Sequence, residues 1–213
     1  MISTSTLLPV RRYRLAGLLG FALGTWYAVF VRFYQAAGGT IGLPDAPPPG
    51  LAWASYTAGL LILVGAVACL VLTQPSLRTG PAWSPVLAGR SLPRWFMISC
   101  CAVPTMIAAI FAIGHGAGGG FAKVLEAAGV GIASIRADDP RGSAAELTWQ
   151  IAFYQPWFLA FGICMAVAAI GYLREAGVRP PTVRRVSTLV ITLSLIISLY
   201  FVLAMMLHWN IVI

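Results

Sequence analysis

Five apolar runs of about 20 residues dominate the pattern of hydrophobic and polar positions along the chain. A helix rises 1.5 Å per residue, so about 20 residues cross a hydrocarbon core of about 30 Å. Apolar residues are continuous within each run, whereas a strand of a membrane barrel alternates over about ten residues. The pattern predicts an all-α, polytopic membrane protein with five transmembrane helices, at residues 15–35, 51–73, 95–115, 151–173 and 186–208.

The connection after the third run carries a second helical signal. Apolar residues recur there at spacings of four and three, which places them on one side of a helix. These residues are Phe121, Leu125, Ala128, Ile132 and Ile135. The spacing predicts an external amphipathic helix that lies on the membrane surface or caps the bundle, and the nearby glycines are equally compatible with a broken helix. We expect residues 1–213 to form a single helical bundle with this segment outside it.

Charge is scarce and unevenly placed. Charged residues make up 9% of the chain, hydrophobic residues make up 59%, and the mean hydropathy is +0.85, whereas soluble domains have about 25% charged residues. Ten of the 14 basic residues precede the first run or lie in the second and fourth connections: Arg11, Arg12, Arg14, Arg78, Arg90, Arg94, Arg174, Arg179, Arg184 and Arg185. The positive-inside rule then predicts a plasma (inner) membrane protein with a cytoplasmic N-terminus and an external C-terminus. This distribution explains the net charge of +8 without nucleic acid as a partner.

Polar residues gather at the opposite membrane boundary. Arg32 follows Arg14 by 18 residues, which is about 27 Å of helix and places Arg32 near the outer interface. The same count along the other helices brings a set of polar residues to this depth: Arg32, Gln35, Tyr56, His115, Tyr154, Gln155 and His208, with Asp45 and Glu146 above them. We interpret this layer as a binding site. The leading hypothesis is a non-catalytic protein that binds a lipid-like ligand or a partner membrane subunit at its outer-leaflet face.

Two alternatives use the same layer differently. A membrane-embedded enzyme acting on a lipophilic substrate would use His115 as acid or base, with Arg32 or Tyr154 orienting a substrate oxygen. That hypothesis requires His115 and Tyr154 to face a common cavity. A b-type haem protein would use His115 and His208 as the two axial ligands. The four cysteines fall within the predicted helices without a C-x-x-C pair, so we predict neither a cysteine-based metal site nor another cofactor.

The small residues and the mid-membrane positions argue against two further functions, dinucleotide binding and proton-coupled transport. The stretch GHGAGGG contains the glycine spacing of a dinucleotide-binding loop, but it follows a membrane helix rather than a strand, which excludes that site. The central thirds of the predicted helices hold no ionisable side chains apart from cysteine and tyrosine, which disfavours proton-coupled transport. Gly20 and Gly24 have the four-residue spacing that lets helix backbones approach closely, so we expect this face to pack inside the bundle.

Two short stretches resemble a known family. RFYQAAGGTIGLP ends the first predicted helix, and FYQPWFLAFG opens the fourth. They are similar to stretches of a family of small bacterial polytopic membrane proteins with a domain of unknown function. In place of the family's Tyr-Trp pair, this chain has Tyr34 and Gln35. The resemblance covers the first four helices, implies a helical membrane bundle and implies no particular activity.

Overall fold

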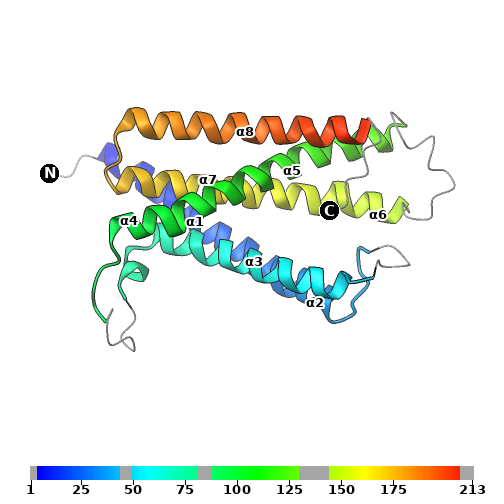
Figure 1. Ribbon diagram of the computed structural model, residues 1–213, viewed down its shortest axis with the longest axis horizontal. Coiled ribbons are helices and arrows are strands. Elements are labelled where there is room, and N and C mark those ends of the chain that lie inside the picture. Colours follow the sequence, from blue (N-terminus) through cyan, green and yellow to red (C-terminus); the bar gives the residue numbers. More distant parts are fainter. Residues whose placement is uncertain (1–3, 44–48, 81–87, 130–143, 207–213) are drawn as a thin grey trace.

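Five helical segments are long and apolar enough to cross a membrane in the computed structural model, which describes residues 4–43, 49–80, 88–129 and 144–206 (Figure 1). These segments are Arg12–Ala36, Leu51–Thr73, Arg94–Ala127, Ala144–Glu175 and Pro180–Ala204. The prediction of an all-α polytopic membrane protein is therefore confirmed.

Three of the five segments contain a π-helical insert. The first segment is α1 (Thr4–Tyr27), the π-helix η1 (Ala28–Phe33) and α2 (Tyr34–Ala36). The second is α3 (Leu51–Thr73), followed by the short 3₁₀ turn η2 (Pro75–Arg78). The third is α4 (Arg94–Phe96), the π-helix η3 (Met97–Ala102) and α5 (Val103–Ala127). The fourth is α6 (Ala144–Trp149), the π-helix η5 (Gln150–Tyr154) and α7 (Gln155–Glu175), and the fifth is α8 (Pro180–Met206).

The third helix is longer than its hydrophobic run predicts. It continues through α5 to Ala127, and Gly129 follows with a φ of 74°, a conformation that commonly ends a helix. Phe121 and Leu125 therefore belong to the same helix as His115 and not to a separate amphipathic one. Ala128 follows α5 directly as its C-cap residue, and Ile132 and Ile135 lie outside the described residues.

The glycine-rich stretch of α5 is a packing surface. A Cβ atom on Gly114 would lie 2.5 Å from a side-chain carbon of Ile197 in α8, and one on Gly116 would lie 2.5 Å from the backbone nitrogen of Leu159 in α7. Gly118 meets the backbone of Ser198 in the same way. Because glycine allows these close approaches, the stretch stays helical and brings α5 against α7 and α8.

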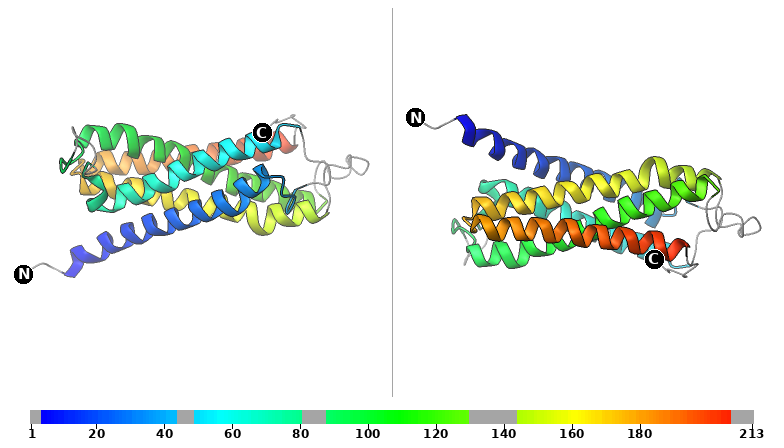
Figure 2. Two further views of the ribbon diagram at one scale, coloured as in Figure 1. Left: turned by 90° about the horizontal axis from the view of Figure 1, so that it is seen from below. Right: turned by 90° about the horizontal axis from the view of Figure 1, so that it is seen from above.

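Helix α7 lies at the centre of the bundle. It packs against α1, α3 and α5, whereas α8 packs mainly against α5 at the edge (Figure 1). In their most apolar windows, 56% of the fourth segment is buried and only 11% of the fifth. The N-terminal part of α1 projects away from the other helices (Figure 2). Outward-facing leucines such as Leu195, which is 64% exposed, suit a helix whose free side meets lipid.

The small-residue face of α1 packs inside the bundle, as expected. A Cβ atom on Gly20 would lie 3.0 Å from the sulfur of Cys69 in α3. One on Gly24 would lie 2.7 Å from the Cβ of Ala66 and 2.9 Å from the Phe161 ring of α7. These contacts confirm that the four-residue spacing serves helix packing.

One end of the bundle, which we call the arginine end, holds the C-termini of α3 and α7 and the N-termini of α4 and α8 (Figure 1). Arg78 ties two of these helices together there. Its two terminal nitrogens donate to the Glu175 carboxylate at 2.8 and 2.9 Å, and its guanidinium carbon lies 4.9 Å from the centre of the Tyr172 ring. The same side chain donates to the carbonyls of Val71 and Leu72 at 3.2 and 2.7 Å. The arginine thus satisfies carbonyls that the end of α3 leaves without helical partners.

Candidate ligand-binding cavity

A cavity of about 680 Å³ lies between α3 and α5, and these helices separate towards the end of the bundle opposite the arginine end (Figure 1). We call it the α3–α5 cavity. Helices α7 and α1 line its inner side, and α2, α6, η5 and α8 add residues near its wider end. Its lining comprises Tyr27, Arg32, Gln35, Gly42, Leu43, Ala58, Leu61, Ile62, Gly65, Ala108, Phe111, Ala112, His115, Glu146, Gln150, Tyr154, Phe158, Phe161, Met165 and Phe201.

The cavity opens on the flank of the bundle. Leu61 of α3 and Phe111 of α5 both line it, yet they are 69% and 59% exposed. Each lies near the middle of its membrane-length segment. A molecule dissolved in the hydrocarbon layer therefore has a route into the cavity between α3 and α5.

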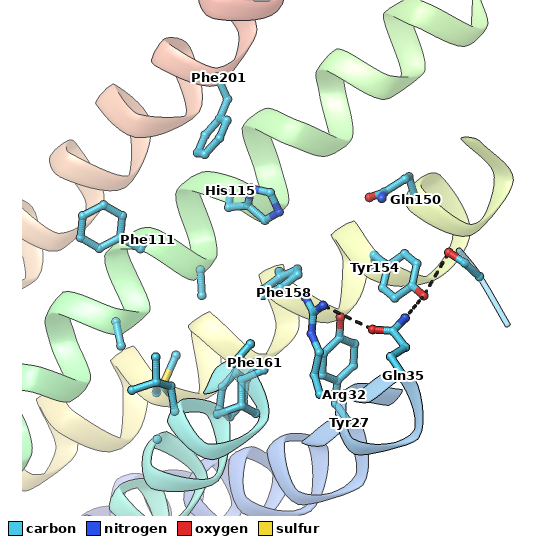
Figure 3. A pocket seen from close by; sticks show the side chains of 18 of the residues that line it. Tyr27, Arg32, Gln35, Phe111, His115, Gln150, Tyr154, Phe158, Phe161 and Phe201 are labelled. Carbon is cyan, nitrogen blue, oxygen red and sulfur yellow. Dashed lines mark hydrogen bonds between the residues drawn. The ribbon is translucent and has the colours of Figure 1, made fainter. Parts of the chain in front are cut away.

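A chain of hydrogen bonds organises the wide end of the cavity (Figure 3). Arg32 Nη1 donates to Gln35 Oε1 at 3.4 Å, Gln35 Nε2 donates to the Tyr154 hydroxyl at 3.2 Å, and that hydroxyl donates to the Gly42 carbonyl at 3.4 Å. Gln35 is buried, so its amide has little freedom to reorient. The chain joins η1, α2 and η5 and fixes the side on which Arg32 presents its guanidinium.

Arg32 brings a positive charge to this end. Its guanidinium carbon lies 5.5 Å from the centre of the Tyr27 ring, a distance at which a cation is attracted to an aromatic face. Its Nε is buried and has no hydrogen-bond acceptor among the described residues. Within the described ranges the salt bridges join other residues, and none involves Arg32. The side chain lines the cavity and is only partly buried, so its terminal nitrogens can donate to a ligand, whereas the buried Nε is out of reach.

The π-helix η1 explains how Tyr27 lies beneath Arg32. The two residues are five apart, and a regular α-helix would turn them to different sides. Hydrogen bonds in a π-helix connect residues five apart, so η1 brings them to the same side. Tyr27 is fully buried and its ring stacks on Trp157 at 3.8 Å, which makes it a rigid support.

His115 enters the cavity from α5. Its ring meets the Phe158 ring of α7 edge-on at 4.8 Å and the Phe201 ring of α8 at 5.0 Å (Figure 3). Gln150 and Glu146 line the same end from η5 and α6. His115 and Tyr154 thus face one cavity, which is the geometric condition for an acid–base site built on these two residues.

The deeper part of the cavity is apolar. Phe161 and Met165 lie in α7, beyond Tyr154 at the end of η5, and Ala108 and Phe111 precede His115 along α5, so all four lie nearer the arginine end. Leu61, Ile62 and Gly65 complete this region from α3. The cavity therefore has a polar wide end and an apolar deep end, as a site for an amphiphile requires.

The structure brings together part of the predicted polar layer. Arg32, Gln35, His115 and Tyr154 line the cavity, and so does Glu146. The other predicted residues do not: Tyr56 is 45% exposed on α3 and stacks on Trp53, and Gln155 packs against Gly119 and donates to Gln150 at 3.1 Å. His208 and Asp45 lie outside the described residues.

Tyr27 and the apolar half of the site were missed from the sequence. Tyr27 lies in the apolar interior of the first run, where depth alone gives no reason to single it out. Its position five residues before Arg32 is a signal only once the π-helix is known. Phe111, Phe161 and Met165 look in the sequence like any other core residues of a membrane bundle.

No cluster of three or more potential metal-ligating side chains occurs within the part of the chain that the structure describes. Haem ligation by His115 and His208 stays a prediction, because His208 is not among those residues. Fold and cavity together define the class: a polytopic helical membrane protein with an amphipathic cavity that opens on its flank. Comparisons with protein-family models, curated proteins and solved structures found no match. The resemblance to the small bacterial membrane proteins therefore stays a prediction.

Proposed function

We propose that this protein is a non-catalytic bacterial plasma membrane protein that binds a lipid-like molecule in the α3–α5 cavity. The observation that carries the proposal is the arrangement of the lining: Arg32 stands at the polar end, an apolar chamber lies below, and a side opening runs between Leu61 and Phe111. The volume of about 680 Å³ falls in the range of about 300 to 1,000 Å³ that is typical of ligand sites.

Membrane orientation supports this function. The positive-inside rule assigns the arginine end to the cytoplasm, with the N-terminus on that side and the C-terminus outside. The wide end of the cavity then faces the outer interface, where lipid head groups lie. A lipid entering sideways from the outer leaflet keeps its head group at the depth of Arg32 and its chain at the depth of Phe161.

The test is lipid analysis of protein purified in mild detergent. Wild-type protein is expected to retain about one lipid-like molecule per chain, measured by native mass spectrometry and by extraction. Ile62→Trp places a large ring in the cavity and is expected to remove most of that molecule. Val67→Trp is the matched control, because Val67 lies on the same helix, is 49% exposed and is not part of the lining.

Equal lipid content in Ile62→Trp and Val67→Trp would contradict the proposal, as would wild-type protein with no bound lipid. A partner membrane subunit is the other occupant that we expect for this face. It would be recovered with the wild-type protein as a second polypeptide in constant ratio, and a lipid-free complex of that kind would favour it over the lipid.

A membrane-embedded enzyme is the second candidate. It is favoured by one observation, that His115 and Tyr154 line the same cavity. Such an enzyme would convert a lipid of the host membrane, and His115→Gln would stop the conversion while leaving lipid binding in place. Incubation of purified protein with extracted lipids, followed by mass spectrometry, tests this: an unchanged lipid profile counts against catalysis.

A further inference from the structure

The polar end of the α3–α5 cavity is rich in hydrogen-bond donors whose acceptors are only partly supplied by the protein. Gln35 and Tyr154 use their donors on each other and on the Gly42 carbonyl. Arg32 uses one terminal nitrogen on Gln35, and because its side chain lines the cavity and is only partly buried, its terminal nitrogens are within reach of a ligand, whereas its buried Nε is not. A guanidinium carries five N–H donors and a permanent charge, so the group that completes this end is an oxyanion.

The positive charge of the lining limits the charge of that oxyanion. Among the described residues that line the cavity, Arg32 is the one with a positively charged side chain. One negative charge on the head group balances it and a second would stay unbalanced in poorly polarisable surroundings, so a head group with one negative charge suits this end better than a doubly charged one. A planar carboxylate also matches the paired donors of a guanidinium.

The apolar end limits the size of the ligand. A volume of about 680 Å³ holds on the order of 20 water-sized groups at about 30 Å³ each. A methylene group is of similar size, so the cavity accommodates one long alkyl chain with its head group. Two acyl chains and a glycerol phosphate do not fit inside it together, so a two-chain lipid would leave one chain outside the opening, whereas a single-chain amphiphile is enclosed along its length.

We propose that the ligand is a single-chain amphiphile with a carboxylate head group, held by Arg32 at the wide end and by Phe111, Phe161 and Met165 along its chain. This inference rests on the proposed lipid-binding function and names the class of lipid. The side opening between Leu61 and Phe111 lets such a molecule enter chain-first from the bilayer.

A competition experiment tests the head group directly. Detergent-solubilised protein is mixed with equal amounts of oleate, oleyl alcohol and oleyl phosphate in alkaline buffer, where a carboxyl group is ionised. Native mass spectrometry then measures the three complexes in one sample. We expect the oleate complex to exceed each of the other two at least tenfold in wild-type protein and in Arg94→Gln, a control at the exposed arginine end. In Arg32→Gln we expect the preference for oleate over the alcohol to disappear.

The possible outcomes distinguish failure of the carboxylate proposal from failure of the proposed lipid-binding function. Equal binding of oleate and oleyl alcohol by wild-type protein overturns the carboxylate head group and leaves lipid binding intact, and a preference for oleyl phosphate does the same. Binding of none of the three, together with no difference in retained lipid between Ile62→Trp and Val67→Trp, overturns both. The relative amounts of the three complexes formed by wild-type protein test the carboxylate head group even if Arg32→Gln fails to fold.

Discussion

Replacement of Arg78 by alanine tests how the arginine end holds α3 to α7. The side chain makes three kinds of contact: a two-pronged pair with Glu175, donation to the carbonyls of Val71 and Leu72, and stacking over the Tyr172 ring. Only the first is an ion pair. The three kinds of contact are expected to contribute unequally to the free energy of unfolding.

The burial of each partner decides the magnitudes. The Glu175 side chain is 51% exposed and the Arg78 side chain 15%, so we assign the ion pair the about 0 to 1 kcal/mol of a solvent-screened surface pair. The two bonds to carbonyls contribute about 1 kcal/mol each, below the about 1.5 to 3 kcal/mol of a buried charged donor, because the end of α3 is partly solvated. Stacking over Tyr172 adds about 0.5 to 1 kcal/mol. We therefore expect Arg78→Ala to cost about 3 kcal/mol and Glu175→Ala less than about 1 kcal/mol.

The assay is reversible unfolding in mixed micelles of increasing denaturing detergent, followed by tryptophan fluorescence. Arg78→Ala, Glu175→Ala and the double variant form a cycle that isolates the ion pair. A coupling energy below about 1 kcal/mol, with a large effect of Arg78→Ala alone, agrees with this reasoning. Equal effects of the two single variants would refute it, because the ion pair would then account for the whole contribution of Arg78.

Three further predictions concern packing, topology and haem. Gly17→Leu is expected to destabilise the bundle by about 1 to 3 kcal/mol, because any side chain there overlaps Thr73, whereas Ala22→Leu on the exposed side of α1 is expected to be tolerated; equal stabilities in the same unfolding assay would contradict the packing. Alkaline phosphatase fused in the loop after α5 is expected to be active, and fused after Gly177 to be inactive; the reverse pattern would invert the proposed orientation. Purified protein from haem-supplemented cells is expected to lack a Soret band, and a band that disappears in His115→Ala would support the haem hypothesis instead.

The sequence predicts the membrane helices well because soluble domains rarely contain continuous apolar runs of about 20 residues. The α3 bounds agree with the predicted residues 51–73, since Gly50 and Pro75 interrupt the helix at its two ends. The sequence pattern places the end of the third helix too early, because glycines in a sequence look like helix breakers. In the bundle Gly114 and Gly116 are the positions where α8 and α7 approach, so the helix runs on to Ala127.

The sequence predicts the depth of the site residues but not the direction in which their side chains point. Depth in the membrane is predicted by counting residues along a helix, and this count selects Arg32, His115 and Tyr154, which line one cavity in the structure. Direction depends on how each helix is rotated about its axis, and π-helical inserts shift that rotation for Arg32 and Tyr154. Tyr56 has the right depth, yet it faces away from the cavity.

A crystal structure of the protein grown in a lipid phase tests the central claim most directly. We predict elongated density inside the α3–α5 cavity, with its polar end on Arg32 and its chain running past Phe111 and Phe161. An α3–α5 cavity that holds only ordered water, or that is closed by α3 and α5 packing together, would contradict the claim that the protein binds a lipid-like molecule there.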